Sequence, residues 1–232
     1  MTFKTTFVIA VACLWGAAAP AAPPEGSSTR VEHTEVVVPW EAEFAAFAKA
    51  DAANPPPVGG VLFVGSSSIR LWNDLEQQFD GREVVLKRGF GGSQLSDCVR
   101  NLNRLVVRYR PRTVLVYAGD NDLAAGVSPS EVRQRFADFV EGIHRELPNT
   151  RIAYISIKPS PSRASLLPAI RTANAMIREF ASDHRNVAFI DVFTPMMDAA
   201  GAPRRELFVE DALHLNRDGY ALWKTVIGPY VL

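Results

Sequence analysis

Cysteine is scarce in this sequence, which has only Cys13 and Cys98 among its 232 residues. Cys13 lies in an apolar stretch at residues 7–19 that we expect to be removed, and the single remaining thiol excludes an internal disulfide. The spacing of Leu95, Cys98 and Leu102 places that thiol on the apolar face of a predicted helix. This pattern predicts a buried structural cysteine rather than a reactive one.

An excess of charge of one sign is also missing, because 25 lysines and arginines stand against 25 aspartates and glutamates. The basic residues are scattered, which excludes the electrostatic footprint of a nucleic-acid-binding protein. Histidine is rare, and His33, His144 and His184 do not have the spacing of a metal site. We therefore expect neither a nucleic-acid partner nor a metal or other cofactor.

The apolar stretch at residues 7–19 is too short to span a membrane. It follows Lys4 and ends in small residues, which is the pattern of a secretory signal peptide, and we predict cleavage after Ala21. The predicted organisation is a signal peptide at residues 1–21, a flexible leader at 22–38 and a single domain at 39–232. An uncleaved anchor and a lipid on Cys13 are the alternatives. The protein is expected to be exported, to the periplasm or outside the cell.

Short apolar, β-rich runs alternate with longer helical patterns in the rest of the chain. The expected strands are residues 61–64, 84–86, 113–117, 152–157 and 187–190. A first helix is expected at residues 40–50, with Phe44 and Phe47 facing inward, and it ends before the prolines at 55–57. Alternating strands and helices imply crossover connections. We therefore predict an α/β fold, a three-layer α/β/α sandwich with a central parallel sheet of about five strands.

One later helix has an especially clear beginning. Ser128 and Glu131 have the spacing of a capping box, and Pro129 occupies the first helical position. Apolar residues then recur at helical spacing: Val132, Phe136, Phe139, Val140, Ile143 and Leu147. We expect this face to pack in the core.

Small and polar residues follow three of the predicted strands where each strand ends. They are residues 65–68 (Gly-Ser-Ser-Ser), 89–93 (Gly-Phe-Gly-Gly-Ser) and 119–122 (Gly-Asp-Asn-Asp). The carboxyl ends of parallel strands meet at one edge of the sheet, where such folds bind ligands. Near the C-terminus, Asp211 precedes His214 by three residues, so the chain has the serine, base and carboxylate that nucleophilic chemistry requires. Taken alone, residues 65–68 also fit a helix N-cap or a phosphate cradle.

In order and spacing, four of these segments resemble the sequence blocks of the SGNH (GDSL-like) hydrolase family. They are residues 65–67, Gly92, residues 119–122 and residues 211–214. The resemblance extends over residues 58–232, and it implies the flavodoxin-like fold of SGNH hydrolases. A Gly-x-Ser-x-Gly elbow is missing, which disfavours an α/β-hydrolase.

The resemblance also implies roles for five residues. Ser67 would be the nucleophile of a catalytic triad, His214 its base, and Asp211 the group that orients the histidine. The oxyanion hole would consist of the backbone N–H groups of Ser67 and Gly92 and the side-chain amide of Asn121. Such donors act on the oxygen that becomes negatively charged during ester hydrolysis.

The sequence departs from the family at two positions. The aspartate that usually precedes the nucleophile is Ser66, so the serines beside Ser67 are alternative nucleophiles. Asp120 stands where the family often has a small residue, and its charge either acts on the histidine or pairs with an arginine such as Arg70. Asp120, Ser160 and Ser162 are also candidates for a substrate-binding wall, because they follow the third and fourth strands.

These features predict an exported, cofactor-free serine esterase that acts on a small-molecule or carbohydrate ester with a short acyl group, such as acetyl. The short intervals between the blocks leave little room for a lid, and an open site suits small acyl groups. A lysophospholipase or thioesterase would use the same residues. A non-catalytic carbohydrate-binding relative and an anion-binding flavodoxin-like module are the alternatives from other classes.

Overall fold

The computed structural model describes residues 40–79 and 84–231. The predicted signal peptide, its cleavage site and the leader at residues 22–38 lie outside the described residues. Among the residues that the structure describes, no helix has both the length and the apolar character needed to cross a bilayer.

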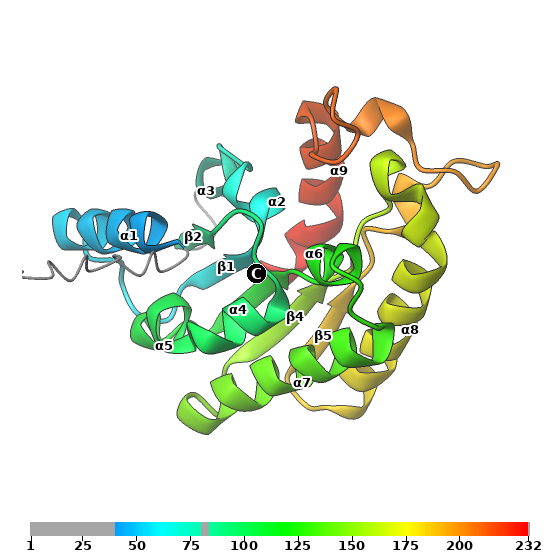
Figure 1. Cartoon of the computed structure of the whole chain (residues 1–232). Coiled ribbons are helices and arrows are strands. Elements are labelled where there is room, and N and C mark those ends of the chain that lie inside the picture. The colour runs from blue at the N-terminus through cyan, green and yellow to red at the C-terminus, as the bar shows by residue number, and fades with distance from the viewer. Residues whose placement is uncertain (1–39, 80–83, 232) are drawn as a thin grey trace, which may run out of the picture. The chain divides into compact units, whose positions relative to one another are not determined.

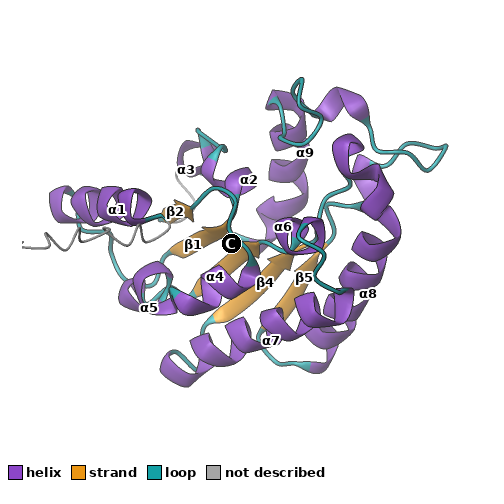
Figure 2. Ribbon diagram, viewed as in Figure 1, coloured by secondary structure: helices purple, strands orange, loops and turns teal. Residues whose placement is uncertain are grey.

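The centre of the fold is a five-stranded sheet in which every neighbouring pair is parallel, as predicted. The strand order is β2-β1-β3-β4-β5 (Figures 1 and 2). The strands are β1 (Val61–Gly65), β2 (Val85–Gly89), β3 (Thr113–Tyr117), β4 (Arg151–Ile155) and β5 (Val187–Ile190). The chain order reverses between β1 and β3, so the ligand crevice is expected at the carboxyl ends of these two strands.

Helices cover both faces of the sheet, because the side chains of each buried strand alternate between two cores. Leu62 and Val64 point into one core, and Val61 and Phe63 into the other. The helices of the first core are α1 (Glu41–Ala53), α4 (Leu95–Arg100), α5 (Leu102–Leu105), α7 (Pro129–Glu146) and α8 (Leu167–Asp183). Those of the second core are α2 (Ser67–Arg70), α3 (Leu75–Gln78) and α9 (Arg217–Ile227). The three-layer prediction is therefore confirmed.

Short helical segments lie between these elements or, for the last of them, after α9. They are α6 (Asp120–Ala124) and the 3₁₀ turns η1 (Val107–Tyr109), η2 (Pro161–Leu166), η3 (Thr194–Met196), η4 (Arg205–Leu207) and η5 (Gly228–Tyr230).

Helix α7 begins as expected, but only half of the predicted capping box forms. The Ser128 hydroxyl accepts the backbone N–H of Glu131 at 3.2 Å, and Pro129 is the first helical residue. The Glu131 carboxylate pairs with Arg135 instead, at 3.2 Å, because an i,i+4 cation lies within reach on the exposed face.

Helix α1 ends before the prolines, as predicted, but it begins one residue later and ends three residues later than the expected range of 40–50. Trp40 lies just outside it, with a left-handed backbone (φ 64°). The Trp40 indole donates a hydrogen bond of 2.7 Å to the Gly91 carbonyl, and its ring meets Phe90 edge to face at 5.3 Å between centroids. These contacts connect the start of α1 to the loop after β2.

Cys98 is a free and fully buried cysteine in α4, as predicted from its spacing. Burial raises the pKa of its thiol, because the apolar surroundings disfavour the thiolate. The helical pattern around it is interrupted at Asn101, so the predicted face is shared between α4 and α5.

Candidate active site

Ser67 is placed by a turn between β1 and α2 that requires glycine. Gly65 has φ +136°, and a Cβ atom there would lie 1.9 Å from the Tyr117 carbonyl oxygen. The neighbouring Ser66 N–H donates to the same oxygen at 3.0 Å, so the turn stays against the end of β3. Ser67 is the first residue of α2, and it therefore lies where the order of the strands reverses.

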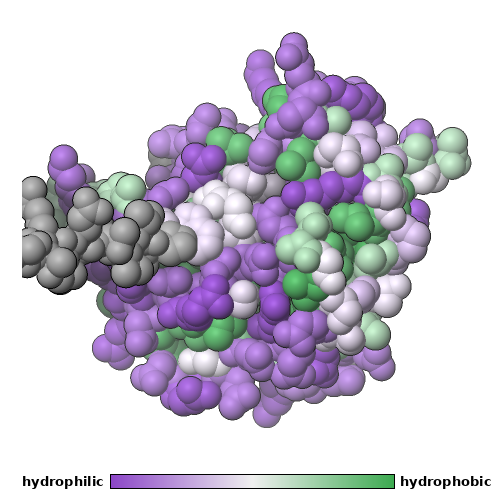
Figure 3. Space-filling view, in the orientation of Figure 1, coloured by the Kyte–Doolittle hydropathy of each residue, from purple (hydrophilic) through white to green (hydrophobic). Residues whose placement is uncertain are grey.

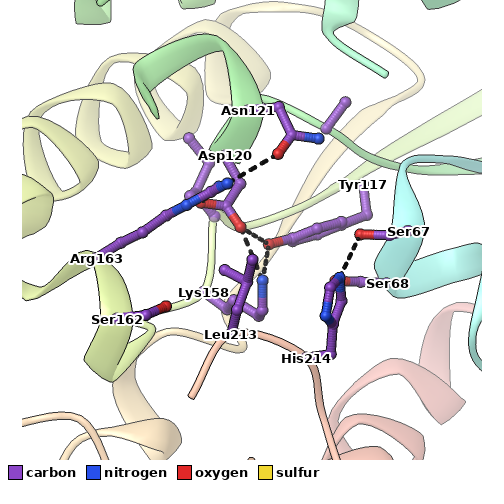
Figure 4. Close-up of polar contacts among 12 residues, drawn as sticks. Ser67, Ser68, Tyr117, Asp120, Asn121, Lys158, Ser162, Arg163, Leu213 and His214 are labelled. Carbon is purple, nitrogen blue, oxygen red and sulfur yellow. Dashed lines mark hydrogen bonds and ion pairs between the residues drawn. The ribbon is translucent and has the colours of Figure 1, made fainter. Parts of the chain in front are cut away.

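The structure distinguishes the three consecutive serines. The Ser67 hydroxyl lies 2.9 Å from His214 Nε2, and Ser67 is only half-buried. Ser66 and Ser68 are buried, with 3% and 1% of their surface exposed. The Ser68 carbonyl accepts the Tyr220 hydroxyl at 2.9 Å, which connects α2 to α9. Of these three hydroxyls, that of Ser67 is the one that contacts the histidine (Figure 4).

Asp211 and His214 form a compact loop in which the carboxylate makes three contacts. Asp211 Oδ1 accepts the backbone N–H groups of Leu213 and His214, at 2.8 and 2.9 Å. Asp211 Oδ2 lies 2.6 Å from His214 Nδ1. Ala212 has a left-handed backbone (φ 55°), which lets the chain turn between the two side chains. The short spacing therefore does produce the contact between carboxylate and imidazole.

The charge of Asp211 determines the tautomer of the histidine. Burial raises the pKa of Asp211, but the hydrogen bonds from His214 and Leu213 lower it more, to about 2. An ionised carboxylate only accepts hydrogen bonds, so Nδ1 of the neutral His214 ring carries the proton. The lone pair of Nε2 then faces the Ser67 hydroxyl, which is the arrangement of a general base.

Packing between α2 and α9 holds this loop over Ser67. Trp72, just after α2, stacks on Tyr220 of α9 with ring centroids 5.2 Å apart. Asn216 caps α9 by accepting the backbone N–H groups of its first turn, and its amide donates to the Glu206 carbonyl at 2.7 Å. Ser162 also holds the loop that contains Asp211 and His214. Its N–H and its hydroxyl both donate to the Ala212 carbonyl, at 3.1 and 3.0 Å.

The three amide donors that the resemblance implies belong to Ser67, Gly92 and Asn121. The Ser67 N–H is at the first position of α2, where no intrahelical acceptor exists. Gly92 has φ +75°, and no acceptor for its N–H is found in the described part of the chain. The Asn121 amide nitrogen donates to the Ser93 carbonyl at 3.1 Å, which leaves one amide proton available. In Figure 4 this nitrogen is on the Ser67 side of the amide and the oxygen is on the Arg163 side.

Asp120 is buried in a charged network beside Asn121. Its carboxylate contacts Lys158 Nζ at 2.8 Å, Arg163 Nη1 at 2.5 Å and the Tyr117 hydroxyl at 3.3 Å (Figure 4). Burial alone would raise the pKa of Asp120. The two cations Lys158 and Arg163 lower it by more than burial raises it, so the carboxyl group is ionised. Of the two alternatives for Asp120, the structure shows the pairing with an arginine, but the partner is Arg163 and not Arg70. The side chain of Arg70 lies against Gly91 instead.

None of the three candidates for a substrate-binding wall presents a free side chain to a ligand. Asp120 and Ser160 are buried, with 4% and 0% of their surface exposed, so neither offers a surface to a ligand. Ser162 is exposed but uses its hydroxyl to hold the Ala212 carbonyl. The sequence suggested only the serines of this segment as wall candidates, and it did not predict the buried cation of Lys158 or the contact of Arg163 with Asn121.

Metal ligands do not gather around this site. Among the described residues, no group of three or more histidine, cysteine, aspartate or glutamate side chains has the arrangement of a metal site. His144 and His184 contact the backbone carbonyls of Thr150 and Phe180, at 3.0 and 2.7 Å.

Comparison with known proteins identifies one family. Residues 60–222 match the GDSL-like Lipase/Acylhydrolase family. A search of curated proteins finds no match.

Solved structures share the fold at low sequence identity. A GDSL-like lipase from Bacteroides thetaiotaomicron superposes with a TM-score of 0.70 at 21% identity, covering 82% of this chain and 97% of that one. An acetyl esterase mutant solved with acetate ion gives 0.59 at 17% identity, over 75% and 96% of the two chains. A carbohydrate esterase family 3 protein from Talaromyces cellulolyticus gives 0.59 at 16%, over 75% and 96%.

Proposed function

This chain belongs to the GDSL-like lipase/acylhydrolase family and is a serine ester hydrolase, and from that premise we propose that it works through an acyl-enzyme on Ser67. The observation that carries the proposal is the continuous series of contacts from Ser67 Oγ through the His214 ring to Asp211, at 2.9 and 2.6 Å. A serine hydroxyl needs this arrangement, because it is a weak nucleophile at neutral pH.

In the first half of the reaction, Ser67 Oγ attacks the ester carbonyl carbon while His214 Nε2 takes the hydroxyl proton. The tetrahedral intermediate then expels the alcohol, which receives that proton from His214, and the acyl group remains on Ser67. In the second half, His214 takes a proton from water, and the resulting hydroxide attacks the acyl carbon. Release of the acid returns the proton to Ser67. Asp211 stays ionised and stabilises the imidazolium at each step.

The developing oxyanion is stabilised by the backbone N–H groups of Ser67 and Gly92 and by the Asn121 amide. Gly92 suits this role because its N–H has no acceptor among the described residues and its positive φ favours glycine. The amide of Asn121 donates without being titratable. Loss of one such donor typically lowers turnover by about a hundredfold to a thousandfold.

For the substrate we propose a short-chain ester, such as an acetyl ester of a carbohydrate or another small polar alcohol. Hydrophilic residues predominate on the face seen in Figure 3, while hydrophobic residues gather to the right of its centre, in the region of α6 and α8. Partly buried apolar side chains that follow α6 or lie at the start of α8 include Val127, Leu166 and Leu167. An apolar surface of this kind suits the acyl group of an ester. The polar residues around it suit the alcohol part. Two structural neighbours, an acetyl esterase and a carbohydrate esterase, support the same class.

We further propose that the protein is exported, since residues 7–19 have the pattern of a signal peptide. N-terminal sequencing of the mature protein tests this, and the expected new N-terminus is Ala22. An intact N-terminus in the mature protein, or retention in the cytoplasm, would contradict export by cleavage.

The test of the activity is hydrolysis of p-nitrophenyl esters from acetate to palmitate. We expect turnover that is highest for acetate and is lost in Ser67→Ala. Ser66→Ala is the matched control, because it removes a neighbouring buried hydroxyl and is expected to keep activity. Absence of turnover on every ester would refute the esterase proposal. Full activity of Ser67→Ala would show that another residue is the nucleophile. Preference for palmitate would favour a lysophospholipase.

A further inference from the structure

Two of the proposed oxyanion donors are amide groups. In each, the carbonyl oxygen accepts a hydrogen bond from a side chain outside the triad. The Gly92 N–H belongs to the same peptide group as the Gly91 carbonyl, and that carbonyl accepts the Trp40 indole N–H at 2.7 Å. The Asn121 carbonyl oxygen accepts Arg163 Nη2 at 3.1 Å. The same arrangement therefore occurs twice in one site.

An amide is planar, so a hydrogen bond to its oxygen also fixes the direction of its N–H groups. Such a bond withdraws electron density from the nitrogen, and cooperative strengthening of about 10–30% per bond is the usual condensed-phase range. Both effects favour a negatively charged oxygen on the N–H side.

Arg163 is itself held in place. Its Nη1 lies 2.5 Å from the buried Asp120 carboxylate, which also contacts the fully buried Lys158 at 2.8 Å. Arg163 has 17% of its side chain exposed, so it is largely shielded from water. One carboxylate between two cations leaves an excess positive charge behind Asn121.

Trp40 comes from outside the segment that matches the family, since that segment begins at residue 60. The T-shaped contact with Phe90 fixes the indole, and Phe90 directly precedes Gly91. Helix α1 adds a second contact, because the Phe44 ring packs on the same Phe90 ring with centroids 5.5 Å apart. A segment that precedes the matched region thus contacts the loop of the oxyanion donor.

We propose that Arg163 and Trp40 are positioning residues of the oxyanion hole, Arg163 acting through Asn121 and Trp40 through the peptide group of Gly91 and Gly92. This inference rests on the proposed function, because it presupposes that these amides stabilise the oxyanion.

The test of Arg163 is a double-mutant cycle with Asn121. Arg163→Met is expected to lower kcat by about tenfold to a hundredfold, the range of a hydrogen bond from a charged donor, and to leave KM unchanged. In the Asn121→Ala background the same change should have almost no further effect. Arg145→Met, which removes an exposed arginine of α7, is the matched control and should retain full activity.

Arg163→Lys separates orientation from charge. A lysine keeps the positive charge beside Asp120 but lacks the planar fork that contacts both Asp120 and Asn121. We expect its kcat to be as low as that of Arg163→Met. Full activity of Arg163→Lys, or additive losses in the cycle with Asn121→Ala, would overturn the role of Arg163.

The test of Trp40 is Trp40→Phe, which keeps an aromatic ring against Phe90 and removes the indole N–H. We expect kcat to fall by about threefold to tenfold, the range of one neutral hydrogen bond, with KM unchanged. This loss should add to that of Asn121→Ala, because the two act on different donors. An unchanged kcat would overturn the role of Trp40.

Wild-type turnover and the Ser67→Ala variant separate this inference from the proposed function. If the wild type hydrolyses esters and Ser67→Ala does not, but Arg163→Met and Trp40→Phe are fully active, only the positioning role fails. If no ester is hydrolysed by the wild type, the proposed function fails first.

Discussion

Replacing Asp120 with asparagine is expected to destabilise the protein strongly, although the two side chains have nearly the same shape. The Lys158 ammonium is 1% exposed and has the Asp120 carboxylate at 2.8 Å as its charged partner. Without that charge it retains the Tyr117 hydroxyl, at 3.1 Å. Removing one partner of a buried ion pair typically costs about 3–5 kcal/mol, because the other charge stays buried and uncompensated. For a chain of this size, that corresponds to a fall in Tm of roughly 6–20 °C.

The double variant Asp120→Asn/Lys158→Met provides the decisive comparison. It removes both members of the pair, so it should regain much of the stability that Asp120→Asn loses. Glu141→Gln is the matched control, because it breaks an exposed pair with Arg145 that is worth at most about 1 kcal/mol. Thermal and urea unfolding followed by circular dichroism measure all four proteins. Wild-type stability of Asp120→Asn, or a double variant that is no more stable than Asp120→Asn, would refute the argument.

The pH dependence of this difference has a defined sign. Lys158 and Arg163 hold the pKa of Asp120 below its ordinary value of 3.8, against the opposing effect of burial. The stabilisation by the ionised carboxylate is therefore complete above pH 3.8, and it is lost as the pH falls through the lower pKa of the folded state. The stability gap between wild type and Asp120→Asn should shrink on acidification, and a gap that widens there would contradict this assignment.

Four further predictions concern the turn, the triad and the thiol. Gly65→Ala should unfold or inactivate the protein, because its Cβ would lie 1.9 Å from the Tyr117 carbonyl, and circular dichroism with an esterase assay would show it. In an NMR titration the Asp211 carboxyl should titrate at about pH 2, and His214→Ala should move it up toward 3.8; an unchanged value would contradict the contact. Asp211→Asn should lower kcat by up to about 10⁴-fold, since asparagine no longer fixes the tautomer, and near-normal turnover would exclude that role. Cys98 should react with thiol reagents only after denaturation, and fast labelling of the folded protein would show that the site opens.

Much of the sheet could be predicted from the sequence, because apolar runs bounded by small residues leave few alternatives. The strands at 113–117 and 187–190 have the predicted bounds, whereas β2 extends to Gly89 rather than ending at Leu86. Its last residues include Lys87 and Arg88, which look like the end of a strand. They remain in the sheet because Lys87 Nζ reaches the Trp72 carbonyl at 2.9 Å and Arg88 pairs with the buried Asp51. Such compensation depends on tertiary contacts that no local pattern records.

The charged network could not be predicted for the same reason. Lys158 lies among prolines and serines after β4, where a lysine is normally solvated. Its burial results from Asp120 and Tyr117, some 40 residues earlier, and Arg163 reaches the same carboxylate from η2. Sequence spacing identified the backbone positions that meet at this edge, but the choice between Arg70 and Arg163 required the path of the loop after β4.

The contact between Ser67 and His214 joins residues 147 positions apart, and it has a consequence for biosynthesis. The nucleophile is among the first parts of the domain to be synthesised, whereas the base and the helix that holds it, α9, are among the last. Because Tyr220 of α9 bonds the carbonyl of Ser68, the serine turn and the histidine loop are completed together. A chain that ends before α9 would therefore keep both Ser67 and His214 but lack the helix that holds the histidine loop over the serine, and hydrolytic activity is expected only once α9 has docked.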